Sequence, residues 1–211
     1  MSKVDFVDGR SKRALDQRKK TKEKILRAAQ QVIGKKGFQS TSVEDVLKAS
    51  DISRGTFYLY FESREVLFHE LIDGFTDELK NRVQPIQMTN LKPVKQLQDN
   101  LVRIIEFMFE NRDLSILLLK EAVGNTHIEG VDQKLRQLYE FLYKRASGAI
   151  NNGVKLGLTR KVNEQILSIA VIGSIKEVVY HYLTSTEKNR PSAEAMAKEL
   201  VDCFIKGLVR F

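Results

Sequence analysis

The 211-residue chain has few residues that cross-link a chain, interrupt helices or fill a core with a large ring: one cysteine, three prolines and no tryptophan. The single cysteine, Cys203, excludes an internal disulfide framework and a zinc site built from cysteines, and it suits a reducing, cytoplasmic setting. The longest purely apolar runs are about four residues, such as Ile116–Leu119, whereas roughly 20 are needed to span a bilayer. Met1–Lys24 is charged throughout and lacks the apolar stretch of a signal peptide. We therefore expect a soluble, cytoplasmic protein.

Residues able to build a catalytic or metal centre are sparse and scattered. The three histidines, His69, His127 and His181, are isolated, and no cluster of His, Asp or Glu has the spacing of metal ligands. A nucleophile beside a placed base and a phosphate-binding loop are also lacking. We therefore expect no enzyme, no metal and no cofactor, although an all-helical enzyme or small-molecule carrier with a basic tail stays as the alternative.

The few prolines and scattered glycines leave long segments with helical periodicity, which predicts an all-α fold of about nine helices. The first helix is expected from about Gln17 to Lys36, because one face carries the apolar residues Ile25, Ala29, Val32 and Ile33. The residues before it have few apolar anchors and are expected to form a loose, basic arm. The expected division is an arm, a three-helix domain and a larger helical domain, over residues 1–16, 17–62 and 63–211.

The excess of basic side chains is concentrated near the N-terminus. Residues 1–62 hold 14 Lys and Arg against 8 Asp and Glu, whereas residues 63–211 hold 21 against 19. The segment from Arg10 to Lys36 alone has eleven basic residues and two acidic ones. This asymmetry predicts a polyanionic partner, either nucleic acid or an anionic membrane. The first helix lacks the large apolar anchors of a membrane-surface helix, which argues against a peripheral membrane protein.

Two short helices joined by a tight turn are predicted within residues 41–61. Thr41 and Glu44 have the spacing of a capping box for the first, and Ser53 can cap the second. Helix, turn and helix in this order match the helix-turn-helix plan, in which the start of the second helix faces base edges in the major groove. Arg54 can reach guanine or a phosphate, and Gly55 allows close approach of the backbone to the duplex.

Further side chains of this segment are suited to phosphate oxygens. The hydroxyls of Tyr58 and Tyr60 can donate to them, and Ser42 stands at a helix N-terminus, where free N–H groups attract anions. Phe57 and Phe61 are spaced for the domain core. The predicted DNA-binding residues are Thr41, Ser42, Ser53, Arg54, Gly55, Thr56, Tyr58, Tyr60 and Arg64.

The order and spacing of these residues resemble the N-terminal signature of the tetracycline-repressor (TetR/AcrR) family over residues 21–68. Four positions differ from the usual pattern. Ser50 stands where that family has a glycine in the turn, Leu47 replaces a common alanine and Ile33 a common phenylalanine. Arg64 replaces a common lysine, which keeps the charge directed at phosphate. The matching runs are Ile25-Leu26-x-Ala28-Ala29, Gly37-Phe38, Thr41-Ser42-Val43, Ile52-Ser53-x-Gly55-Thr56-Phe57-Tyr58-x-Tyr60-Phe61 and Ser63-Arg64-Glu65-x-Leu67.

The resemblance implies a homodimeric, ligand-responsive transcription regulator, usually a repressor, that binds a palindromic operator of double-stranded DNA and is released by a small-molecule effector. It also implies that the C-terminal domain holds the ligand cavity, and that helices near 162–184 and 193–210 form the dimer surface. Gly173 and Ser174 would allow close approach of a partner helix. Core packing or exposure to water is the default for single side chains there, and the candidates for ligand contact are Phe107, His127, Tyr143 and Glu177.

Overall fold

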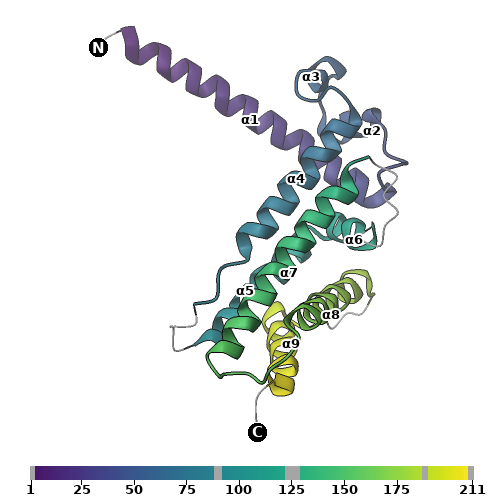
Figure 1. Cartoon of the computed structure of the whole chain (residues 1–211). Helices are drawn as coiled ribbons and strands as arrows, with labels where there is room; N and C mark the ends of the chain where they lie inside the picture. Colours follow the sequence, from purple (N-terminus) through teal and green to yellow (C-terminus); the bar gives the residue numbers. More distant parts are fainter. Residues whose placement is uncertain (1–2, 88–91, 122–128, 187–189, 209–211) are drawn as a thin grey trace. The chain divides into compact units, whose positions relative to one another are not determined.

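The computed structural model confirms an all-α fold. Within the described parts of the chain, which are residues 3–87, 92–121, 129–186 and 190–208, there are nine helices and no strand (Figure 1). Their bounds are α1 Lys3–Lys36, α2 Val43–Ser50, α3 Arg54–Tyr58, α4 Arg64–Arg82, α5 Pro93–Glu110, α6 Arg112–Glu121, α7 Val131–Lys155, α8 Glu164–Thr184 and α9 Ala193–Leu208.

The chain divides into two compact units, Met1–Leu71 and Ile72–Phe211. The division falls inside α4, nine residues after the boundary expected between 62 and 63. The physical reason is that the first two turns of α4 belong to the core of the first unit. Phe68 is buried there, and its ring centroid lies 4.3 Å from that of Phe38.

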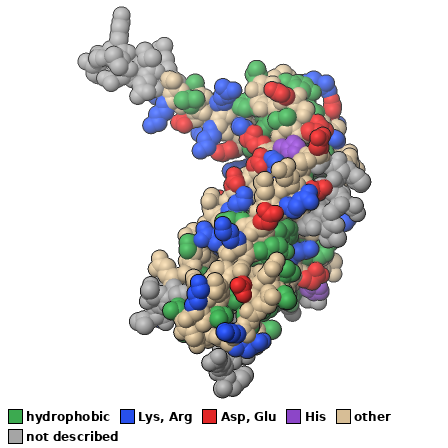
Figure 2. Space-filling view, viewed as in Figure 1, with side chains coloured by type: hydrophobic (Ala, Val, Ile, Leu, Met, Phe, Trp, Pro, Cys, Tyr) green, Lys and Arg blue, Asp and Glu red, His purple; other side chains and the backbone are tan. Residues whose placement is uncertain are grey.

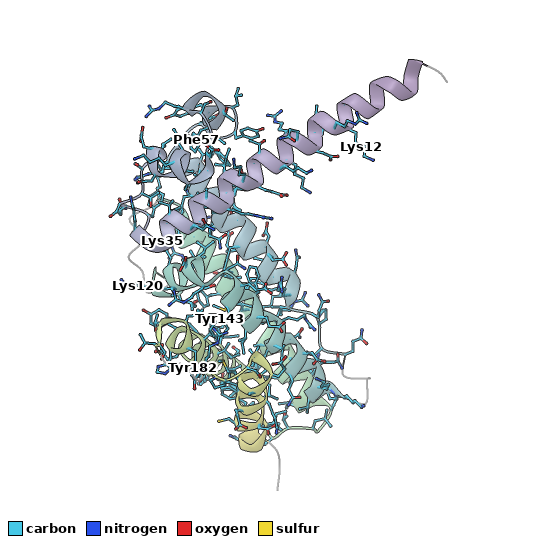
Figure 3. All side chains as sticks on the ribbon, turned by 180° about the vertical axis from the view of Figure 1, so that it is seen from behind. Lys12, Lys35, Phe57, Lys120, Tyr143 and Tyr182 are labelled. Atoms are coloured by element: carbon cyan, nitrogen blue, oxygen red, sulfur yellow. The ribbon has the colours of Figure 1, made fainter. Side chains whose placement is uncertain are left out.

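The core of the first unit contains the apolar face of α1, which packs against α2, and the two phenylalanines of the α3 region. Ile25, Ala29 and Ile33 are buried, as predicted from their spacing, and so are Phe57 and Phe61. The rings of Phe57 and Phe61 lie 5.7 Å apart, and Figure 3 labels Phe57 among these helices. This packing fixes α3 on the rest of the unit by one face only.

The expected loose arm is helical instead, since α1 begins at Lys3 rather than near Gln17. The arm contains two Lys, two Arg, one Ala and one Leu, which favour helices, and it contains no proline. Asp16 stands four residues before Lys20, the order of charges that stabilises a helix. In Figure 1 this end of α1 extends away from α2 and α3, and residues 11–20 are all exposed.

The second unit is built by packing α5 against α9 and α7 against α8, with α6 also contacting α8. Ile105, Val131, Val179 and Leu183 are buried in its core. The apolar face of α5 is turned to this core, with Leu101, Ile105 and Met108 buried.

Helix α8 leaves part of its apolar surface uncovered. Ile166 is 67% exposed and Ile169 is 49% exposed, and Gly173 meets open space. Among the described residues, α8 is the one helix that is long and apolar enough to cross a membrane by length and composition, although only 17% of that window is buried in the chain. The expectation that no segment reaches this threshold was therefore wrong, because the isolated Ser and Gly interrupt the apolar runs without making the helix polar.

Two amide side chains of α5 hold the segment that precedes it. The buried Asn100 donates to the carbonyl of Gln84 at 2.8 Å and accepts from the N–H of Gln84 at 3.0 Å. One turn earlier, Gln96 makes the same pair of bonds with Gln87, at 3.1 and 2.9 Å. An extended segment whose backbone groups would otherwise lack partners is thereby tied to the helix.

Replacing Asn100 with alanine is expected to destabilise the second unit. The substitution leaves both backbone groups of Gln84 without partners, which costs about 2 kcal/mol. Urea unfolding followed by circular dichroism measures the change. Asn152→Ala, at an exposed position on α7, is the control and should shift stability by less than about 0.5 kcal/mol. Equal stability of both variants would contradict the role of Asn100.

Candidate nucleic-acid interface

Helix α2 begins one residue later than predicted. Its N-cap is Ser42, whose Oγ accepts from the N–H of Asp45 at 3.1 Å, while the Asp45 carboxylate accepts from the N–H of Ser42 at 3.0 Å. The capping box is thus formed by Ser42 and Asp45, not by Thr41 and Glu44. Thr41 is 1% exposed, and its hydroxyl donates to the carbonyl of Gly37 at 2.8 Å. The prediction of a DNA contact at Thr41 was wrong, because the residue is enclosed by the loop that precedes the helix.

Asp45 also ties the start of α2 to the end of α1. Lys36 Nζ lies 2.6 Å from its Oδ1. The hydrogen bond from Lys36, followed by those from the backbone and side chain of Ser42, holds the pKa of the Asp45 carboxyl well below its usual range. The carboxylate is therefore ionised but neutralised by its neighbours, so it opposes the approach of a polyanion less than a free carboxylate would.

The turn between α2 and α3 depends on Ser50 and Asp51. Ser50 stays helical and buried, with its hydroxyl donating to the carbonyl of Val46 at 2.6 Å. Asp51 takes the left-handed conformation, with φ of 48°, and ends α2. A serine at position 50 is therefore compatible with the turn, since the residue that needs positive φ is the next one, and Asp tolerates it better than most residues.

Helix α3 presents the predicted side chains outward. Ser53 caps it, accepting from the N–H of Thr56 at 3.1 Å. Ser53, Arg54 and Gly55 are exposed and Thr56 is half-buried, whereas Phe57 on the opposite face is 0% exposed. One face of the helix is therefore buried through an aromatic ring, and the opposite face exposes small or long polar side chains to solvent.

The tyrosines of this segment differ in their surroundings. Tyr58 is 48% exposed. Tyr60 is half-buried, and the guanidinium of Arg18 on α1 lies 5.9 Å from its ring centroid. The exposed Leu59 lies between them. Both hydroxyl-bearing residues stand on the same short segment as the outward face of α3, with one α1 cation close to Tyr60.

Two arginines of the candidate interface are already engaged. Arg54 forms an ion pair with Glu44 of α2, and both side chains are more than half exposed. Arg64 is held more firmly: it donates to the carbonyl of Thr41 at 2.9 Å, and its guanidinium lies 4.5 Å from the ring centroid of Phe38. The structure thus assigns Arg64 to fastening the start of α4 onto the loop before α2, a role that the sequence prediction of a phosphate contact missed.

The residues predicted to contact a ligand lie on three different helices of the second unit. Phe107 of α5 is buried against Phe75, with ring centroids 5.0 Å apart. Tyr143 of α7 is half-buried, with its ring centroid 6.0 Å from that of Tyr139, and Glu177 of α8 is exposed. Tyr143 is labelled in Figure 3. Their role in ligand contact stays a prediction, and the fourth candidate, His127, lies outside the described residues.

The sequence of this chain is similar to those of known bacterial regulatory proteins. Residues 25–71 match the model of bacterial regulatory proteins of the tetR family. The HTH-type transcriptional regulator YuxN of Bacillus subtilis is 33% identical over 122 residues, which cover 56% of this chain and 42% of the relative. YerO, an HTH-type regulator from the same organism, is 26% identical over 90% of this chain and 66% of its own length. The chain thus spans less than two thirds of either relative.

A solved structure extends the likeness to both units. The transcriptional regulator FadR from Bacillus subtilis, in complex with stearoyl-CoA, aligns over 88% of this chain and 98% of its own with a TM-score of 0.67 and 19% identity. At that identity the likeness concerns the fold. The helical architecture of the second unit is therefore that of known regulators, although its sequence has diverged.

Substituting Asp45 with asparagine is expected to change how stability depends on pH. Since the pKa of Asp45 is lowered in the folded chain, the unfolded chain binds more protons, and the stabilisation is present above about pH 4 and lost as pH falls below it. Unfolding of wild type and Asp45→Asn should therefore differ at neutral pH and converge in acid. Lys36→Ala keeps the carboxylate but removes the main cause of its lowered pKa. The stability of this variant should therefore also depend less steeply on pH in acid. If stability depended on pH in the same way in all three proteins, the assignment of a lowered pKa to Asp45 would be refuted.

Proposed function

We propose that this chain, which belongs to the tetR family of bacterial regulatory proteins, is a sequence-specific, DNA-binding transcriptional regulator that works in the cytoplasm. The observation behind the proposal is the one-sided burial of α3, where Phe57 is enclosed while Ser53, Arg54 and Gly55 are exposed. A helix held in this way after a tight turn is suited to enter the major groove with its N-terminal residues toward base edges.

The proposed contacts divide into base and phosphate contacts. Arg54 leaves Glu44 and donates to the O6 and N7 atoms of a guanine. Gly55 adds no side chain between the backbone and the duplex, and Thr56 lies beside it at the start of the helix. Ser42, at the N-terminus of α2, contacts a phosphate together with Tyr58 and Tyr60.

We propose that two copies assemble through α8 and α9. The exposed residues Ile166, Ile169, Ala170 and Gly173 follow the spacing of one helical stripe along α8, and such a stripe is buried most simply against its own copy. A two-fold dimer presents two α3 helices, so the operator is a palindrome with half-sites about 34–36 Å apart or a multiple of that.

The dimer is further proposed to act as a repressor that a small molecule releases. An effector in the second unit shifts the equilibrium only if it binds the DNA-competent and the released states with unequal affinity. FadR of Bacillus subtilis, which shares this fold, is complexed with stearoyl-CoA, which supports a ligand-binding role for the helical unit. Phe107, Tyr143 and Glu177, with His127, remain the proposed ligand contacts.

The role of Arg54 is tested by selecting bound sequences from a pool of random duplex DNA. Wild type should enrich a palindrome, and Arg54→Ala should relax one base position in each half-site and weaken binding by about 1–3 kcal/mol. Glu44→Gln keeps the arginine and removes its competing carboxylate, so it should bind at least as tightly as wild type. An unchanged motif and affinity in Arg54→Ala would disprove the assignment, provided that circular dichroism shows the variant to be folded.

The dimer surface is tested with Ile169→Glu. A carboxylate in the middle of the apolar stripe would be buried without a partner, so the variant should sediment as a monomer where wild type sediments as a dimer. Gln133→Glu, which adds the same charge at an exposed position on α7, should remain dimeric. A wild-type monomer, or a chain that needs detergent to stay in solution, would contradict this use of α8.

A further inference from the structure

A basic hollow lies on the first unit between α1 and α2, outside the predicted DNA-binding residues. It has a volume of about 370 Å³ and is lined by Lys20, Lys24 and Arg27 of α1 and by Ala49 of α2. Glu23 also lines it, so three cations face a single carboxylate. The hollow therefore has a net positive lining and is open to solvent.

The three cations share one face of α1, because spacings of four and three residues place side chains on one side of a helix. All three are exposed. Two other α1 cations do form ion pairs, Lys22 with Glu70 at 2.7 Å and Lys36 with Asp45 at 2.6 Å. Within the described parts of the chain, no carboxylate lies in ion-pair distance of the lining cations. Their charges are left for a partner outside the chain.

The hollow adjoins the turn that leads into α3. Lys24 Nζ donates to the carbonyl of Asp51 at 3.4 Å, and Asp51 precedes the N-cap of α3, Ser53, by two residues. An anion bound among these cations would therefore sit beside the start of the helix that is proposed to enter the major groove. Figure 2 shows further Lys and Arg side chains along the visible part of α1.

We propose that this hollow binds a backbone phosphate of the duplex, next to the groove occupied by α3. The proposal rests on the proposed function and adds to it a sequence-independent contact made by α1. Lysine and arginine are the side chains that neutralise DNA phosphates, and three of them line this open hollow together. The contact fixes the register of α3 along the duplex without reading a base.

The test measures binding to a duplex of mixed sequence by fluorescence anisotropy over a range of NaCl concentrations. The triple variant Lys20→Gln, Lys24→Gln, Arg27→Gln should bind more weakly and show a salt slope smaller by about 1–3, since each lost phosphate contact removes roughly 0.9. Glutamine keeps the helix propensity of α1. The charge-preserving triple Lys20→Arg, Lys24→Arg, Arg27→Lys should retain the wild-type slope.

A matched control removes equal charge elsewhere. Lys144→Gln, Lys155→Gln, Lys161→Gln removes three exposed lysines of the second unit and should leave the slope unchanged. A wild-type slope in the α1 glutamine triple overturns the inference, and so does a slope equally reduced in the control. If Arg54→Ala weakens binding to the selected palindrome in the same protein preparations, the proposed function stands even when the phosphate contact at the hollow is overturned. Wild type that binds vesicles of anionic lipid but no duplex overturns both proposals.

Discussion

The exposed face of α3 depends on the burial of Phe57 on its opposite side. The helix has five residues, and a helix this short is unstable on its own because nucleation costs more than its few hydrogen bonds return. Burial of Phe57, with its ring against that of Phe61, and the Ser53 cap together supply what the segment lacks. Since Phe57 fixes which way the helix faces, it also determines that Arg54 and Gly55 point outward. The functional surface is therefore a consequence of the core.

A second set of contacts holds the loop between α1 and α2 in place. Asp45 bonds both to Ser42 and to Lys36, and Arg64 bonds to the carbonyl of Thr41 while lying over Phe38. These contacts connect the end of α1, the start of α2 and the start of α4. Charged residues near a proposed DNA surface thus serve two different purposes. Those with short, specific partners position the backbone, and those without a paired carboxylate remain available to an external anion.

The sequence predicted the helices and their buried faces well, because periodicity reports directly on which side chains a helix buries. It predicted the cap of α2 one residue too early, since Thr41 and Ser42 are both good caps and only packing encloses one of them. The contact of Arg64 with the loop was missed for a similar reason: the carbonyl it contacts lies 23 residues away. The helical start of α1 was missed because a segment without apolar anchors gives no periodic signal. The hollow needs Ala49 of α2 beside α1, a pairing that no local pattern encodes.

The paired and unpaired cations together suggest how affinity and specificity are separated in this unit. In the proposed complex the cations of the hollow have no carboxylate to give up, so they would contribute to binding on any duplex and lose that contribution as salt rises. Arg54 must exchange Glu44 for its target, and an exposed pair of this kind is worth little on its own. A guanine edge offers two acceptors and compensates for the lost carboxylate, whereas a base without that pattern does not. On the proposed function, discrimination arises at Arg54, while α1 holds the protein close enough to the duplex for the exchange to be attempted.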